Sequence, residues 1–216
     1  MVLKNYRVLH DVIGLYTLIL VAWGFYRLLF RFPVWVEELF LKPVVFGLPV
    51  LYRLRQDKGK SWRERLESVG ITRTNWWAGV SLGLAVGVFY LLVGGLGMVL
   101  RGGDVIGFEV KESVIVIMVL AVATAISEQL VFMGYILTRL NDFWKHEWWS
   151  VTLTSVLFGL IHVPILVWGL RLPGETVVAQ FLLIMLLGFG NGIVMLRVRN
   201  LVAPVLAQML WGLIAW

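Results

Sequence analysis

The sequence predicts an all-α protein, a polytopic transmembrane helical bundle of about seven spans with one interfacial amphipathic segment. Of its 216 residues, 60% are hydrophobic and 15% are charged, whereas a soluble domain carries roughly 25% charged residues. Several apolar runs reach the roughly 20 residues that a helix needs to cross a bilayer. These runs are continuous instead of alternating, which excludes a transmembrane β-barrel and leaves helices as the spanning elements.

Lys and Arg residues give the chain a net charge of +6 and lie mostly in short connections between apolar runs. Lipid head groups explain that distribution better than nucleic acid does. We therefore expect the lipid bilayer, and no nucleic acid, as a partner. The chain has no cysteine, which excludes disulfides, thiolate chemistry and a Cys-based metal site.

The first predicted span covers residues 8–30. Lys4 and Arg7 precede it, as basic residues precede the apolar part of a signal peptide. The apolar run, however, continues through Trp23 without a small-residue cleavage site. We therefore expect a retained first span.

The second predicted span covers residues 34–54 and carries charged side chains near its beginning. Glu38 and Lys42 are four residues apart and can pair on one face of a helix. We interpret them, together with Glu37, as an interfacial turn without a catalytic role.

Residues 53–73 form a strongly basic segment. Trp62, Leu66 and Val69 are spaced as one stripe of a short helix, which predicts an amphipathic segment lying on the cytoplasmic surface of the membrane. A topogenic charged loop is the plainer interpretation of this segment. Docking of anionic lipid head groups at Arg53–Arg73 is the functional alternative.

The third predicted span, residues 75–100, has no charged side chain. Gly79, Gly83 and Gly87 follow one another at four-residue steps, and such small residues let another helix approach the backbone closely. We expect a packing face here, followed by a short polar connection over residues 101–111.

The fourth and fifth predicted spans, residues 113–139 and 148–168, are joined by a short connection and should be antiparallel neighbours. The fourth has at least about 26 residues and is roughly 39 Å long as a helix, so it must tilt or project beyond the hydrocarbon. Before Arg139 at its end, its one charged residue is Glu128. In the fifth span the one comparable residue is His162.

The sixth predicted span, residues 176–196, has no charge before its end but contains Gln180 and Asn191 and a glycine cluster that thins the helix. The seventh, residues 201–216, is roughly 24 Å long as a helix and short for a full crossing.

Lys and Arg residues fall into two sets on alternate connections, and the richer set should face the cytoplasm. The richer set contains Lys4, Arg7, the 53–73 segment, Arg139, Lys145, Arg197 and Arg199, and the other contains mainly Arg27, Arg31, Arg101, Lys111 and Arg171. This predicts an integral protein of the cytoplasmic membrane with its N-terminus inside.

Glu128 and His162 are the predicted functional site. An ionisable group at the centre of a bilayer costs roughly 2.5 to 3.5 kcal/mol on insertion scales, so such groups usually have a function. A carboxylate facing an imidazole in a water-accessible cavity forms a general base with a partner that holds or polarises the attacked group, which points to hydrolysis. A hydrogen-bonded structural Glu and a core His remain the plainer alternatives.

We expect no metal ion and no other cofactor. Only two candidate ligands stand in the apolar spans, whereas catalytic zinc usually has three protein ligands. His146 and Glu147 begin like a zincin motif, but the second His is missing.

The motifs around these residues resemble those of a known family. Residues 128–134 read Glu-Gln-Leu-Val-Phe-Met-Gly, which is similar to the Glu-Glu-x-x-Phe-Arg-Gly signature of the CAAX prenyl protease and bacteriocin-processing family. Residues 158–162 match its Phe-x-x-x-His motif. Residues 197–204 are similar to the basic turn and apolar-Pro entry that precede its third motif, His-x-x-x-Asn.

The resemblance implies an intramembrane endopeptidase that hydrolyses a peptide bond of a membrane-associated, hydrophobic or lipidated peptide without a metal. Glu128 would activate the water and His162 would help to hold it. Gln129, Gln208 and Asn191 are candidates for supporting or oxyanion-binding groups.

The chain departs from the family motifs at four positions. Gln129, Met133, Gln208 and Gly212 stand where the motifs have Glu, Arg, His and Asn. These departures leave open a non-proteolytic membrane scaffold, binding or immunity-type protein on the same fold. A transporter or proton-conducting protein is a further alternative, because mid-membrane polar residues and glycine-thinned helices also occur there.

We expect one membrane-embedded domain over residues 1–216. Residues 1–111 would supply the N-terminal helices and the basic 53–73 loop. Residues 112–216, which the resemblance covers, would form the family core that carries the site.

Overall fold

The computed structural model of this chain describes residues 2–100 and 113–215, and within them every regular element is a helix. The elements are α1 (Val2–Leu29), α2 (Val34–Val36), η1 (Glu37–Leu41), η2 (Pro43–Gly47), α3 (Leu48–Arg55), α4 (Trp62–Glu67), α5 (Trp76–Leu100), α6 (Val114–Gln129), η3 (Leu130–Leu137), α7 (Thr138–Trp144), α8 (Glu147–Leu160), η4 (Ile165–Gly169), α9 (Gly174–Val198) and α10 (Val202–Ala215), where η marks a π-helical stretch. The predicted all-α bundle is confirmed. The polar connection expected over residues 101–111 lies outside the described residues.

Five helices of the described part are long and apolar enough to cross a membrane, so the chain is an integral membrane protein in contact with lipid. They cover residues 7–29, 76–97, 114–144, 147–169 and 174–198. A shorter apolar helix covers residues 202–213, and α2 to α3 form one further continuous helix. The number of about seven spans stays a prediction.

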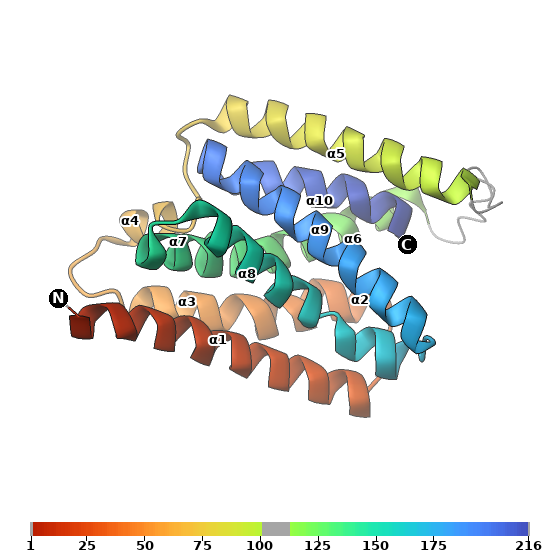
Figure 1. Ribbon diagram of the computed structural model, residues 1–216, viewed down its shortest axis with the longest axis horizontal. Coiled ribbons are helices and arrows are strands. Elements are labelled where there is room, and N and C mark those ends of the chain that lie inside the picture. Colours follow the sequence, from red (N-terminus) through yellow and green to blue (C-terminus); the bar gives the residue numbers. More distant parts are fainter. Residues whose placement is uncertain (1, 101–112, 216) are drawn as a thin grey trace.

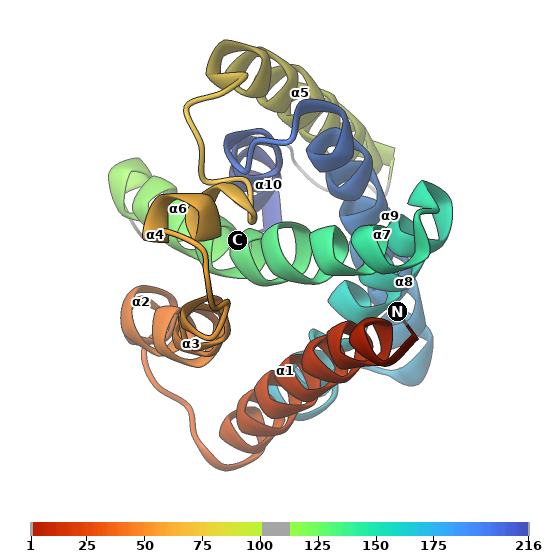
Figure 2. The same ribbon diagram turned by 90° about the vertical axis from the view of Figure 1, so that its left-hand side faces the viewer.

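A long helix made of α6, η3 and α7 runs through the centre of the bundle (Figure 2). α10 packs on α6, α8 and α9 pack on η3, and α1 packs on α7. η1 and η2 also contact α6. Both halves of the chain therefore meet around the point where α6 ends.

α8 follows this central helix after a tight turn at Lys145, whose φ of 55° is left-handed. α8 then packs back against η3 and α7. The prediction that the fourth and fifth spans are antiparallel neighbours is confirmed.

The glycine face of α5 packs on α10, and the two helices lie side by side in Figure 1. A Cβ atom at Gly83 would lie 2.6 Å from the carbonyl oxygen of Ala203 and 2.9 Å from its Cα atom. A Cβ atom at Gly87 would lie 2.6 Å from Leu210. The predicted packing face is confirmed.

The basic segment contains the short helix α4, which begins with a capping box. Ser61 accepts a hydrogen bond from the backbone N–H of Glu64, and the Glu64 carboxylate accepts from Ser61. These hydrogen bonds to its carboxylate, from the Ser61 backbone first, hold the pKa of Glu64 below its usual value. Of the predicted apolar stripe, Val69 is fully buried in the core while Trp62 stays exposed.

Backbone and side-chain hydrogen bonds tie the end of the basic segment to the turn between α9 and α10. The amide of Asn200 donates to the carbonyl oxygens of Thr72 (3.0 Å) and Thr74 (2.8 Å). The N–H of Leu201 donates to the carbonyl of Gly70 at 2.9 Å. The N-terminal helices are thus fastened to the C-terminal half.

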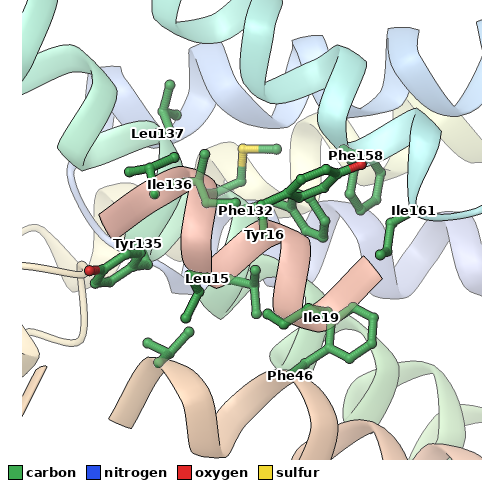
Figure 3. Packing of buried hydrophobic residues seen from close by; sticks show 14 of the residues in the cluster. Leu15, Tyr16, Ile19, Phe46, Phe132, Tyr135, Ile136, Leu137, Phe158 and Ile161 are labelled. Carbon is green, nitrogen blue, oxygen red and sulfur yellow. The ribbon is translucent and has the colours of Figure 1, made fainter. Parts of the chain in front are cut away.

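Aromatic side chains form the middle of the core, between α1, η3 and α8 (Figure 3). The rings of Tyr16 and Phe132 meet edge to face at 6.4 Å, and those of Phe132 and Phe158 at 5.1 Å. The Phe158 ring in turn lies 4.9 Å from the ring of His162. Phe132 and Phe158 are the aromatic residues of the two motifs. Their contact therefore packs η3, which follows Glu128, against α8, which precedes His162.

Candidate active site

Glu128 lies in the last turn of α6, immediately before the π-helical stretch η3, and only 3% of it is exposed. Its Oε1 atom lies 2.8 Å from the Lys42 ammonium nitrogen. Its Oε2 atom accepts a hydrogen bond of 2.5 Å from the Gln208 amide. Both oxygens of this buried carboxylate are therefore bound by donors, as a buried charge requires.

His162 lies in the turn between α8 and η4, with its Nε2 atom 3.7 Å from Oε1 of Glu128. That distance is too long for a direct hydrogen bond. Its Nδ1 atom is 2.8 Å from the carbonyl oxygen of Phe158. Because a carbonyl only accepts, Nδ1 carries the hydrogen, and Nε2 of the neutral ring is left with a lone pair near Glu128.

Lys42 and Glu38 join this site from the second helix. The Lys42 nitrogen lies 2.8 Å from Oε2 of Glu38 as well as 2.8 Å from Glu128. The hydroxyl of Thr124 on α6 donates to Oε2 of Glu38 at 2.5 Å. Glu38 and Lys42 are only 3% and 6% exposed.

The interpretation of residues 37–42 as an interfacial turn is therefore wrong. Glu38 and Lys42 do pair, as their spacing predicted, but α6 and the other helices enclose the pair. Charges near the beginning of a span look interfacial in a sequence, because the sequence does not show which helices cover them. The position of Lys42 eight residues inside its predicted span was the available signal.

A second buried ion pair lies beside the first. Arg27, in the last turn of α1, lies 2.6 Å from Oε2 of Glu37, and the Tyr26 hydroxyl donates to the same carboxylate. The Arg27 guanidinium also stacks over the Trp23 ring at 4.5 Å. The distribution of basic residues had placed Arg27 in an external connection, whereas it pairs with Glu37 and only 10% of its side chain is exposed.

The amides of Gln129 and Gln208 form a chain that ends on Glu128. Gln129, fully buried, donates from Nε2 to Oε1 of Gln208, and Gln208 donates from its own Nε2 to Glu128. Asn191 is not part of this chain of hydrogen bonds. It lies on α9, where its Oδ1 accepts a hydrogen bond from the Tyr90 hydroxyl at 3.4 Å. Asn191 is not among the residues that line the cavity beside Glu128.

A cavity of about 360 Å³ opens beside the catalytic candidates. Glu38, Lys42, Glu128, His162 and Gln208 contribute its polar wall. Its apolar wall includes Trp23, Phe46, Phe158, Ile161, Leu166 and Trp211. A mostly apolar pocket with a few convergent polar groups is the usual form of a binding site for a small or extended apolar ligand.

The four departures from the family motifs lie in different surroundings. Gln208 and Gly212 line the cavity, and Gln129 lies behind it. Met133 is fully buried in the apolar core. The cation next to Glu128 therefore comes from Lys42 and not from position 133.

Within residues 2–100 and 113–215 no group of three or more His, Asp or Glu side chains is arranged to hold a metal ion. His146, the start of the incomplete zincin motif, instead caps α8 by accepting from the N–H of Trp149 at 3.4 Å. Independence of a metal stays a prediction for this site.

The model of the type II CAAX prenyl endopeptidase Rce1-like family matches residues 110–214 of this chain. No curated protein and no solved structure matches this chain. The matched segment contains Glu128, His162 and Gln208, whereas Glu38 and Lys42 precede it.

Proposed function

We propose, on the premise that this chain belongs to the Rce1-like family of type II CAAX prenyl endopeptidases, that it is an intramembrane peptidase acting on a hydrophobic or lipidated peptide. The observation that carries this proposal is the pairing of the Glu128 carboxylate with the His162 imidazole, 3.7 Å apart in the wall of an apolar cavity. A general base and a hydrogen-bonding partner at that separation can hold one water molecule between them and the substrate.

The reaction begins with a water molecule whose two hydrogens face Oε1 or Oε2 of Glu128 and Nε2 of His162. Its oxygen attacks the scissile carbonyl carbon while Glu128 takes the proton, so the carbonyl π electrons move to the oxygen as an oxyanion. The amide of Gln208 has a second hydrogen that can bind this oxyanion. Glu128 then gives its proton to the leaving amine nitrogen as the C–N bond breaks.

The cavity supports an apolar substrate. Aromatic and aliphatic side chains surround the site on the helices α1, α8, α9 and α10, and burial of apolar surface is worth about 25 cal/mol per Å². A lipid-modified or strongly apolar peptide can partition into the bilayer first and reach the cavity from there. Glu38, Lys42 and Glu128 lie together in the wall where the scissile bond would lie.

Hydrolysis of apolar and lipidated peptides by the detergent-purified full chain tests this proposal, with Glu128→Gln and His162→Ala as variants. Loss of the general base should lower the rate by about 10²- to 10⁴-fold. Glu147→Gln is the matched control, because Glu147 is an exposed carboxylate that pairs with Arg197 away from the cavity. Equal rates in wild type, Glu128→Gln and His162→Ala, or no cleavage by any of them, would contradict hydrolysis.

A binding or scaffold protein is the second candidate, and the substitutions at the cavity wall favour it. Gly212 offers no polar side chain where the family motif has Asn, and Gln208 cannot transfer a proton as a His can. On this alternative, wild type and Glu128→Gln bind the same fluorescent apolar peptide with similar Kd and neither cleaves it.

A further inference from the structure

The buried group formed by Glu38, Lys42 and Thr124 has no role in the reaction described above. We propose that Lys42 is a positioning residue for Glu128. The ammonium group of Lys42 is shared between Glu128 and Glu38, so Glu128 can gain and lose a proton without leaving a buried cation unpaired. This inference rests on the proposed hydrolytic role of Glu128. The segment that supplies Lys42 lies before the family-matched residues.

Distances place Lys42 evenly between two carboxylates, at 2.8 Å from each. Glu38 is held by the Thr124 hydroxyl and by its i,i+4 position on the same helix as Lys42. The end of the Lys42 side chain also lies 5.8 Å from the centre of the Trp23 ring. These contacts fix the ammonium group, and the ammonium group in turn fixes Oε1 of Glu128.

The charges around Glu128 come from several helices. Lys42 and His162 are the basic side chains within 4.0 Å of it in the described part of the chain, and Gln208 is its neutral donor. Glu38 is the nearby acidic side chain, and the Lys42 ammonium group contacts both Glu38 and Glu128. Arg27 also lines the cavity but is paired with Glu37 at 2.6 Å.

The balance of these charges depends on the proton of Glu128. With Glu128 ionised and His162 neutral, Glu38, Lys42 and Glu128 carry one net negative charge in apolar surroundings. When Glu128 takes the proton of the water, Lys42 and Glu38 remain as a neutral pair. Lys42 thus favours the carboxylate form that can act as a base, and Glu38 opposes it enough for the proton to be accepted.

Removing Lys42 and removing Glu38 should have opposite effects on the pH dependence of hydrolysis, which a merely structural role would not produce. Lys42→Met should move the acid-side midpoint of hydrolysis to higher pH by about one unit or more, because the ionised form of Glu128 loses its cation. Glu38→Gln should move that midpoint to lower pH, because a neighbouring negative charge is lost. Lys42→Arg keeps the charge and should restore a profile close to that of wild type.

A second measurement does not depend on activity. Dicyclohexylcarbodiimide reacts with protonated carboxyl groups in apolar surroundings, and mass spectrometry of the digested full chain reports its addition at Glu128. At neutral pH, Lys42→Met should label about tenfold faster than wild type or more, and Glu38→Gln more slowly. Lys145→Met is the matched control, because Lys145 pairs with Asp142 on the exposed surface.

The proposal is overturned if Lys42→Met and Glu38→Gln change the labelling rate of Glu128 in the same direction. It is also overturned if neither substitution changes that rate. If Lys42→Met does not fold, Glu38→Gln and Lys42→Arg still decide, because the first must slow labelling of Glu128 and the second must not change it. If no form cleaves a peptide but labelling shifts as expected, hydrolysis fails while the role of Lys42 toward Glu128 stands.

Discussion

Met133 and Gln208 are two positions at which this chain departs from the motifs of the matched family, and their surroundings differ. Gln208 lies at the cavity and bonds to Glu128. Met133 has no exposed surface and packs among core side chains such as Ile136 and Leu137. A polar side chain at position 208 therefore lies at the site, whereas one at position 133 would be buried in the apolar core of the protein.

Met133→Arg should destabilise the protein instead of restoring activity. An uncompensated buried charge typically costs about 3–5 kcal/mol, so we expect a large fall in Tm in detergent. Met133→Leu is the matched control, because a volume-conserving apolar change usually costs less than about 1.5 kcal/mol. A gain of hydrolysis in Met133→Arg at unchanged Tm would contradict the burial argument.

The pairing of α5 with α10 depends on close approach of two backbones. Gly83 lies against the backbone of Ala203, and backbone cannot rotate away as a side chain can. Small residues at such positions are what allow helices to associate within lipid, where the hydrophobic effect does not hold them together.

Gly83→Ala should therefore lower the stability of the bundle. Overpacking of this kind costs typically about 1–3 kcal/mol, measurable as a lower Tm of the detergent-solubilised protein. Gly95→Ala, on the same helix, is the control because a Cβ atom there meets nothing within 4 Å. Equal effects of the two substitutions would show that α5 does not pack as described.

The two ends of the molecule differ in the chain segments and in the parts of the cavity wall that lie there. α4 lies at one end and the turn between η4 and α9 at the other (Figure 1). The cavity is lined by Arg27, Leu170 and Leu172 toward the second of these ends. If the basic segment faces the cytoplasm, as the charge distribution predicts, this part of the cavity wall lies toward the opposite side.

Single-cysteine labelling can test that orientation, because the natural chain has no cysteine. We expect a membrane-impermeant maleimide to reach Lys60→Cys only from the cytoplasmic side and Leu170→Cys only from the opposite side. The same reagent on the detergent-solubilised protein, where both sites are open, is the control. Labelling of both variants from one side in sealed vesicles would contradict this orientation.

The helical membrane fold follows from hydropathy and charge along the chain, and the glycine face of α5 follows from residue spacing. Placement of Glu128 and His162 on consecutive, closely connected spans could also be predicted, because a short connection leaves no other arrangement. In contrast, the roles of Gln129, Gln208 and Asn191 were not distinguishable, because helix periodicity does not tell which neighbour an amide will face.

The sequence by itself determined that this is a helical membrane protein with an acid and an imidazole on neighbouring spans. Only the tertiary structure decided that Glu37, Glu38 and Lys42 are buried in the bundle and that Arg27 pairs with Glu37. The physical reason is that hydropathy measures how apolar a single segment is. Whether a charge at the edge of that segment meets water or another charge depends on which distant helices close over it.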